Sequence, residues 1–161
     1  MFLQAKLTVS RMEDFLGQDI EAGEISRYAE AANNTADKSA KDIETAKFEY
    51  AIALLRSSHN QDIRHGISIL EKLFYEGEKN VRRDYLYYIS IGHAKLKQYN
   101  LALDCVNHFI EIEPQNRQAQ HLRSYINSKL IKDGVTGMVI TGGAALLIGG
   151  LVGLGLAMAK K

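Results

Sequence analysis

Residues 62–74, DIRHGISILEKLF, are echoed by residues 98–114, QYNLALDCVNHFIEIEP. Shifting the second stretch back by 36 residues superimposes its apolar and small positions on those of the first. The matched positions are Tyr99, Ala102, Leu103, Val106 and Phe109 on Ile63, Gly66, Ile67, Leu70 and Leu73. Self-similarity at a fixed offset, with apolar residues at helical spacing, predicts a duplicated helix–turn–helix unit.

The second copy has the rhythm of a tetratricopeptide repeat. Tyr99 is followed three residues later by the small Ala102, and Pro114 comes twelve residues after that. Small side chains are expected where the two helices of a repeat cross, because a larger one would force the helices apart. Gly66 holds the same place in the first copy. We therefore assign Gly66, Tyr99, Ala102 and Pro114 to the packing of the repeats.

The apolar periodicity also predicts helices before and after these two stretches. Residues 2–32 are expected to form one or two helical pieces, with the capping helix at 12–32. The other expected helices are 43–58, 62–76, 82–97, 100–112 and 116–132, with a loop at 33–40 and Asp62 as the candidate cap of the helix at 62–76. Stacked repeats need capping elements on their outer faces, which the first and last of these helices would supply. The predicted fold is an all-α tetratricopeptide-like bundle of two helix–turn–helix repeats with flanking capping helices.

The C-terminal segment differs from the rest of the chain. Residues 135–159 contain no charged residue, and Lys160 and Lys161 follow them. As a helix this stretch would reach about 37 Å, enough to cross a ~30 Å hydrocarbon core with some tilt. A buried core helix is the alternative, but it would be expected to show a polar face. We predict a tail-anchored protein: an N-terminal arm and capping helix at 1–44, repeats with a C-terminal capping helix at 45–133, and a transmembrane helix at 135–159 that contacts membrane lipid.

Within the predicted anchor, small residues recur every four positions. Ala145, Gly149 and Gly153 would lie on one face of the helix, where small side chains let two spans approach closely. This pattern favours self-association into a homo-oligomer through the anchor. Tuning of the hydrophobicity for targeting is the alternative interpretation.

The first helices of stacked pairs line a concave groove, which is the default binding surface of such folds. Residues at i, i+4 and i+7 or nearby on these helices are candidates for partner binding. The candidates are Tyr50, Leu54 and Ser57 on the first groove helix, and Tyr88, Ile91 and Lys95 on the next. Ordinary packing between helices is the alternative for Tyr50, Leu54 and Ile91.

Composition narrows the function classes. The 20 Lys and Arg residues nearly balance the 19 Asp and Glu residues, so the basic excess expected of a nucleic-acid-binding protein is missing. The single Cys105 cannot form an intrachain disulfide and suits a reducing compartment. The five histidines have no i, i+4 pairing or partner cysteine, and no catalytic motif is recognisable. We expect no metal, no cofactor and no enzymatic activity.

The sequence resembles the mitochondrial fission 1 protein family over roughly residues 45–161. The segments that carry the resemblance are Phe48–Ala51, Leu54–Ser57, Asp62–Ile67, Arg83–Tyr85, Leu96–Tyr99, Glu113–Asn116 and Lys132–Gly134. The resemblance implies a non-catalytic adaptor on the outer membrane of mitochondria and on peroxisomes. Such a protein gathers the dynamin-related GTPase of fission, directly or through other adaptors, onto its cytosolic domain.

Two other functions compete with this one. A tail-anchored tetratricopeptide receptor for chaperones or precursor proteins would grip an acidic peptide with several basic groove residues, of which only Lys95 is obvious. A membrane-remodelling protein acting through its helix has little support, because the predicted span holds no charged residue. Phe2, Leu3 and Leu7 suggest in addition that the N-terminal segment folds into the groove when no partner is bound.

Overall fold

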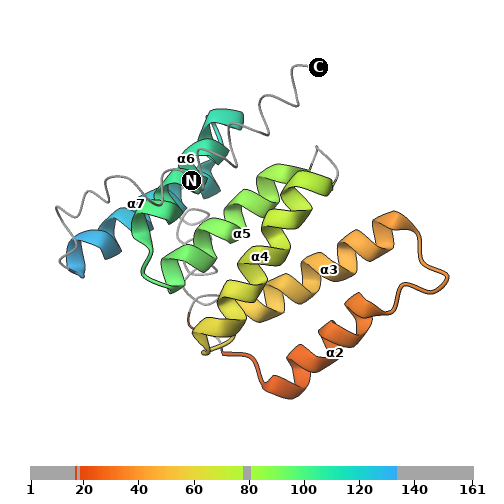
Figure 1. Ribbon diagram of the computed structural model, residues 1–161. Helices are drawn as coiled ribbons and strands as arrows, with labels where there is room; N and C mark the ends of the chain where they lie inside the picture. The colour runs from red at the N-terminus through yellow and green to blue at the C-terminus, as the bar shows by residue number, and fades with distance from the viewer. Residues whose placement is uncertain (1–16, 18, 78–80, 134–161) are drawn as a thin grey trace.

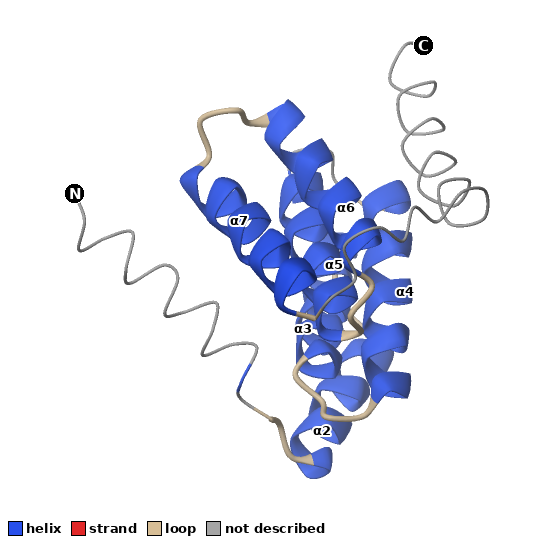
Figure 2. Ribbon diagram, turned by 90° about the vertical axis from the view of Figure 1, so that its left-hand side faces the viewer, coloured by secondary structure: helices blue, strands red, loops and turns tan. Residues whose placement is uncertain are grey.

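The computed structural model describes residues 17, 19–77 and 81–133, and within these ranges it contains helices and no strand (Figures 1 and 2). The described helices are α2 (Ala22–Asn33), α3 (Ala40–Leu55), α4 (Asn60–Glu76), α5 (Arg82–Lys95), α6 (Tyr99–Ile112) and α7 (Arg117–Lys132). The last five correspond to the predicted repeat and C-terminal capping helices, with ends shifted by up to three residues.

The helices stack in chain order. Each helix packs against the next one along the chain, from α2 to α7, and α5 also contacts both α3 and α7. The right-hand end of the stack in Figure 1 is formed by α2 and α3, and the left-hand end by α7. This succession of antiparallel helix pairs is the predicted tetratricopeptide-like architecture, with α3/α4 and α5/α6 as its two repeats.

One hydrophobic core runs through the stack. It draws on helices α3 to α7, and among its fully buried members are Leu55, Leu70, Ile91, Val106, Leu122 and Ile126. Burying an aliphatic side chain of this size contributes roughly 1.5–3 kcal/mol relative to leaving it exposed. The apolar positions that the 36-residue offset had matched all belong to this core or pack against it.

Two glycines set the closest helix crossings. A Cβ added to Gly66 on α4 would lie 2.9 Å from the carbonyl oxygen of Ala51 on α3. A Cβ on Gly92 of α5 would lie 2.7 Å from Cγ1 of Ile67 and 2.9 Å from Cδ2 of Leu55. Both distances are shorter than real Cβ contacts, so any side chain would push α4 or α5 out of place.

Side-chain caps fix where two helices begin. Ser39 and Asp42 form a capping box at the start of α3: the Ser39 hydroxyl accepts the Asp42 N–H at 3.2 Å, and the Ser39 N–H donates to the Asp42 carboxylate at 3.3 Å. The α3 helix therefore begins at residue 40, before the predicted start at 43, and the predicted domain boundary at 44/45 lies inside it. Asn116 caps α7 by accepting the Ala119 N–H at 3.1 Å.

One prediction about a helix start is wrong. Asp62 does not cap α4, which begins at Asn60; its carboxylate instead accepts the Ser57 hydroxyl at 2.6 Å. Of the two arrangements left open for the N-terminal segment, one helix or two pieces, the structure favours two, because residues 19–21 are not helical and α2 begins at Ala22. At this break Ile20 is buried, and its N–H donates to the Arg56 carbonyl at 3.4 Å. Burial of Ile20 against the end of α3 explains why the chain turns here.

No helix within the described ranges is long and apolar enough to cross a membrane. The predicted anchor at 135–159 and the N-terminal residues Phe2, Leu3 and Leu7 lie outside the described residues.

The crossing at Gly66 gives a testable prediction with a matched control. Gly66→Ala should destabilise the protein by about 1–3 kcal/mol, because the added methyl group has no room. Gly23→Ala on α2 adds the same methyl group where nothing lies within 4 Å, and should be neutral or stabilising by up to about 1 kcal/mol. Urea unfolding of the full-length protein in detergent, followed by circular dichroism, measures both; equal effects would contradict the close-crossing argument.

Candidate functional site

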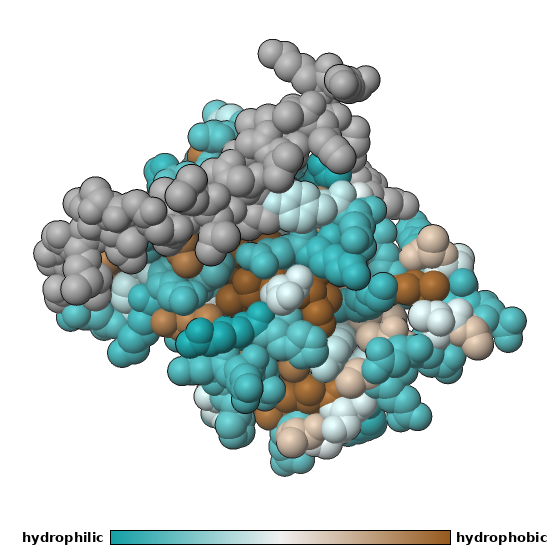
Figure 3. All heavy atoms as spheres, viewed as in Figure 1, coloured by the Kyte–Doolittle hydropathy of each residue, from teal (hydrophilic) through white to brown (hydrophobic). Residues whose placement is uncertain are grey.

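A hollow of about 360 Å³ opens where α3, α5 and the α6–α7 turn meet. We call it the concave hollow and define it by its lining residues, which are Phe48, Arg83, Asp84, Tyr87, Tyr88, Phe109, Glu113, Asn116 and Gln118. It lies on the side of the stack formed by α3, α5 and α7, as expected for the groove of stacked helix pairs. On the face seen in Figure 3, hydrophobic residues show as patches framed by hydrophilic ones.

The floor of the hollow is aromatic. The Phe48 ring lies 5.5 Å from the Tyr88 ring, and Tyr87 lies 5.3 Å from Tyr88 and 6.3 Å from Phe109, all in edge-on geometry. Edge-to-face pairs at these distances are favourable beyond their buried area. The rings therefore support one another and form a preorganised apolar surface.

Tyr88 is the more exposed of the two tyrosines in this floor. Its side chain is half-buried, and desolvation, together with the neighbouring Asp84 carboxylate, raises the pKa of its hydroxyl. The hydroxyl is therefore neutral at physiological pH. A neutral tyrosine ring offers a large, rigid apolar area to a docking segment.

The rim of the hollow is charged. The Arg83 guanidinium pairs with the Glu113 carboxylate, and Glu113 also accepts a hydrogen bond from the Asn116 amide at 2.9 Å. The hydrogen bond from Asn116 is the largest cause of a lowered pKa at Glu113, and the hydrogen bond from Arg83 is the next largest. The start of α5 is thus tied to the α6–α7 turn across the edge of the hollow, while Asp84 adds a half-exposed negative charge.

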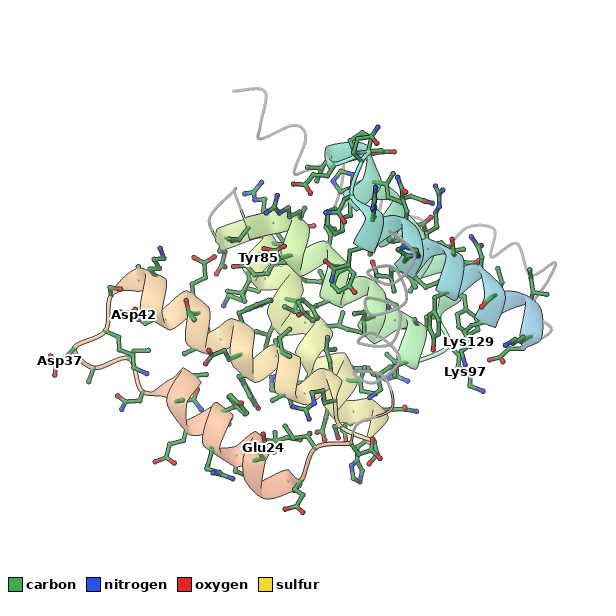
Figure 4. The ribbon with its side chains drawn as sticks, turned by 180° about the vertical axis from the view of Figure 1, so that it is seen from behind. Glu24, Asp37, Asp42, Tyr85, Lys97 and Lys129 are labelled. Carbon is green, nitrogen blue, oxygen red and sulfur yellow. The ribbon has the colours of Figure 1, made fainter. Side chains whose placement is uncertain are left out.

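A second, smaller cavity of about 120 Å³ adjoins the hollow on its α3 side. Its lining residues are Lys41, Glu44, Thr45, Phe48, Val81, Asp84 and Tyr85. The Tyr85 hydroxyl donates to the Glu44 carboxylate at 2.5 Å, which ties α5 to α3 (Figure 4). Phe48 and Asp84 belong to both cavities, so the two cavities are continuous, and the α3 side of the smaller one is polar apart from Phe48.

The described residues were also compared with the geometry of a metal site and of a reactive side chain. Within 19–77 and 81–133, no three His, Cys, Asp or Glu side chains come together as a metal site. Cys105 is buried, and desolvation with the nearby Asp104 and Glu71 carboxylates raises the pKa of its thiol to about 12. Burial likewise lowers the pKa of His93, whose ring contacts the Gln98 amide at 2.9 Å. A neutral thiol and a neutral buried imidazole fit structural roles.

The sequence was compared with models of known protein families, and two of them match. Residues 45–77 match the model of the Fis1 N-terminal tetratricopeptide repeat, and residues 83–135 match that of the Fis1 C-terminal tetratricopeptide repeat. The chain belongs to the Fis1 family. It is therefore a tetratricopeptide-like adaptor of a family associated with mitochondria, and not an enzyme.

Individual relatives agree with this assignment. The chain is 42% identical to the mitochondrial fission 1 protein of Mus musculus over 145 residues, covering 89% of this chain and 91% of that protein. It is 47% identical to that of Homo sapiens over 118 residues, covering 73% and 78%. Among solved structures, yeast Fis1 in complex with an Mdv1 fragment has a TM-score of 0.67 at 26% identity, with 76% of this chain and 93% of that chain covered.

Of the six residues predicted to bind a partner in the groove, only Tyr88 lines the concave hollow. Tyr50 is half-buried and packs edge-on against the His65 ring of α4 at 5.8 Å, which places it between the helices of the first repeat. Leu54 and Ile91 are 2% and 1% exposed. Their burial favours the alternative interpretation for these two residues, which is ordinary packing between helices.

Ser57 and Lys95 also hold the fold together. Ser57 is 2% exposed; its hydroxyl accepts the His59 N–H at 3.1 Å and donates to the Asp62 carboxylate at 2.6 Å. The Lys95 ammonium donates to the Ser57 carbonyl at 3.3 Å, and its partial burial lowers the pKa of this amine. The Ser57 side chain thus ties the α3–α4 turn to the start of α4, and the Lys95 side chain joins α5 to the same turn.

The repeat-packing residues lie where the pattern predicted, with one exception. Gly66, Tyr99 and Ala102 are buried. Pro114 is exposed, and its carbonyl accepts the Gln120 amide at 2.7 Å, so it shapes the α6–α7 turn from outside the core.

Most of the hollow was missed by spacing arguments. Phe48, Tyr87 and Phe109 come from three helices, and Glu113, Asn116 and Gln118 from the turn and helix that follow. Phe48, Arg83 and Glu113–Asn116 stood out only through the family resemblance. The dense aromatic run Tyr85–Tyr88 was a local signal that could have pointed to Tyr87 as well.

The placement of Ser57 gives a prediction that separates packing from binding. Ser57→Ala should lower the free energy of unfolding by about 1–2 kcal/mol, because the Asp62 carboxylate and the His59 N–H lose their shared partner. The neighbouring, exposed Ser58→Ala should change it by under about 0.5 kcal/mol. Urea unfolding measures stability, and partner affinity should stay unchanged; a selective loss of affinity would restore Ser57 to the binding site.

Proposed function

We propose that this Fis1-family protein is a mitochondrial fission adaptor whose concave hollow binds a segment of a second adaptor. That adaptor in turn gathers the dynamin-related GTPase of fission. The observation that carries the proposal is the aromatic hollow between α3, α5 and α7. The fold is similar to that of yeast Fis1, whose structure was solved in complex with an Mdv1 fragment. That fragment contains N-terminal extension and coiled-coil domains.

The hollow has the physical character of a peptide-binding surface. Four aromatic rings provide a preorganised floor, so a docking side chain can be desolvated without reorganising the protein. The charged rim of Arg83, Asp84 and Glu113 can set the register of the bound segment. An apolar residue of the partner in the hollow, flanked by polar residues at the rim, is the arrangement that fits.

The predicted anchor at 135–159 would hold the domain on the cytosolic side of the outer mitochondrial membrane, and also on peroxisomes. Its small-residue face at Ala145, Gly149 and Gly153 would let two copies associate in the bilayer. Tethering raises the local concentration of the hollow at the organelle surface, so a partner of modest affinity is recruited efficiently.

The competing receptor for chaperones or precursor proteins receives no support from the site. That class needs several free basic side chains to grip an acidic peptide. Lys95, its one candidate, donates to the Ser57 carbonyl and is half-buried. Arg83 is engaged by Glu113.

Truncation of Tyr88 tests the hollow. Tyr88→Ala should weaken binding of the Mdv1 fragment by roughly 1–2 kcal/mol, or about five- to thirtyfold in Kd, because a central aromatic anchor is lost. Tyr75→Ala, an exposed tyrosine at the end of α4 outside the hollow, is the matched control and should leave Kd unchanged. Isothermal titration calorimetry measures both, and equal Kd values for the two variants would place the binding site elsewhere.

Removal of residues 135–161 tests the tether. The full-length protein should stay with mitochondrial membranes after alkaline carbonate extraction, because a spanning helix cannot be stripped by charge disruption. The truncated protein should be cytosolic and should no longer alter mitochondrial shape when overproduced. Extraction of the full-length protein by carbonate, or membrane retention of the truncated one, would rule out the anchor.

A further inference from the structure

The last described residue, Asp133, closes a cluster that joins the end of α7 to the α5–α6 turn. Its carboxylate accepts the Tyr99 hydroxyl at 2.5 Å and lies 3.6 Å from the Lys97 ammonium. These two interactions, with the Tyr99 hydrogen bond as the largest cause, lower the pKa of Asp133, which is therefore ionised at neutral pH. We call Tyr99, Lys97 and Asp133 the Asp133 latch.

Both sides of the latch are held rigidly. Tyr99 is 5% exposed within the core, so its hydroxyl has a fixed position. Lys97 sits at φ 58° in the turn that ends α5, where the Gln98 N–H donates to the His93 carbonyl at 2.9 Å. Asp133, which follows α7, is thus held in a fixed position against the α5–α6 turn.

The surface around the latch is basic. Lys97 has a side chain that is 75% exposed, Lys132 is exposed, and the Lys129 ammonium lies 5.4 Å from the Tyr125 ring centre. Figure 4 shows Lys97 and Lys129 beside each other at one end of the molecule, with Asp37 at the opposite end. Ile131, in the same last turn of α7, is 65% exposed.

This surface lies next to the uncharged stretch in the chain. Val135 follows Asp133 by two residues, which span at most about 7 Å even when fully extended. If residues 135–159 enter a bilayer, the latch and its lysines stand at the level of the lipid headgroups. At that depth each lysine strengthens binding to an anionic lipid surface, raising the binding constant by about fivefold.

We propose that Lys97, Lys129, Lys132 and Ile131 form a membrane-contact face that rests on an anionic lipid surface, and that the Asp133 latch fixes the angle at which the domain stands on it. The inference rests on the proposed anchor. Its consequence is that the α2–α3 loop, at the far end of the stack, is held away from the bilayer and the concave hollow is presented at a constant angle.

A lipid surface is the occupant that the observations favour. Three lysines gather here and outnumber the single carboxylate of the latch, which is already paired with Lys97 and hydrogen-bonded to Tyr99. An exposed isoleucine one turn before the uncharged stretch is costly in water but favourable among headgroups. A protein partner at the same place would have to compete with the bilayer for this surface.

The test uses the full-length protein reconstituted into vesicles with and without anionic phospholipid. A donor dye on Ala36→Cys, in the exposed α2–α3 loop, reports distance to acceptor lipids in the bilayer, because Cys105 is buried and should not react. Energy transfer should be low in anionic vesicles. It should rise in Lys97→Gln/Lys129→Gln/Lys132→Gln and in Tyr99→Phe, because the domain can then tip toward the lipid.

The controls separate the possible failures. Lys41→Gln, an exposed lysine on α3 far from the latch, should leave transfer unchanged. Thermal melts should show that Tyr99→Phe, which keeps the buried ring, remains folded. Unchanged transfer in every variant, with all of them resistant to carbonate, would overturn the membrane-contact face while leaving the anchor intact. Release by carbonate would overturn the anchor and the face together, whereas adaptor binding in solution would be unaffected.

Discussion

The close approach of α3, α4 and α5 at Gly66 and Gly92 is the constraint on which the rest of the structure depends. Ala51, Leu55 and Ile67 lie where Cβ atoms on these glycines would have to be. Because the helices nearly touch there, the aliphatic side chains on either side of the crossings can interdigitate and bury the core. A stack with wider crossings would leave voids in that core and would separate α3 from α5.

The concave hollow follows from the same constraint. Phe48 on α3 reaches Tyr88 on α5 only because α4 is held tightly against both helices, and Tyr87 reaches Phe109 across the next pair. The Arg83–Glu113–Asn116 chain of interactions then fixes the start of α7 against the start of α5. The concave hollow is thus formed mainly by helix packing, which suits its proposed role of presenting a constant shape to a partner.

The two ends of the stack have different roles under the proposals made above. The α7 end carries the basic surface and precedes the uncharged C-terminal stretch, while α2 lies at the other end. Between them, the α3–α5–α7 face is open to a cytosolic partner. Since Asp133 joins the end of α7 to the α5–α6 turn, the angle between membrane and hollow would be a property of the folded domain.

The helices and the repeat seen in the structure were predictable from the sequence alone, and the anchor at 135–159 stays a prediction. Apolar spacing located α4 to α7 within a few residues, the matched small positions identified the crossing at Gly66, and charge-free residues 135–159 stood apart from the rest. Helix starts that depend on side-chain caps were less accurate, although Ser39 and Asp42 have the spacing of a capping box. Periodicity reports which residues share a face of one helix, since that depends only on the 3.6-residue turn. It does not report which neighbour covers that face. Only the tertiary structure decided that Leu54, Ser57 and Ile91 are buried while Phe48, Tyr87 and Glu113 meet Tyr88 in a hollow, because those contacts join helices far apart in the chain.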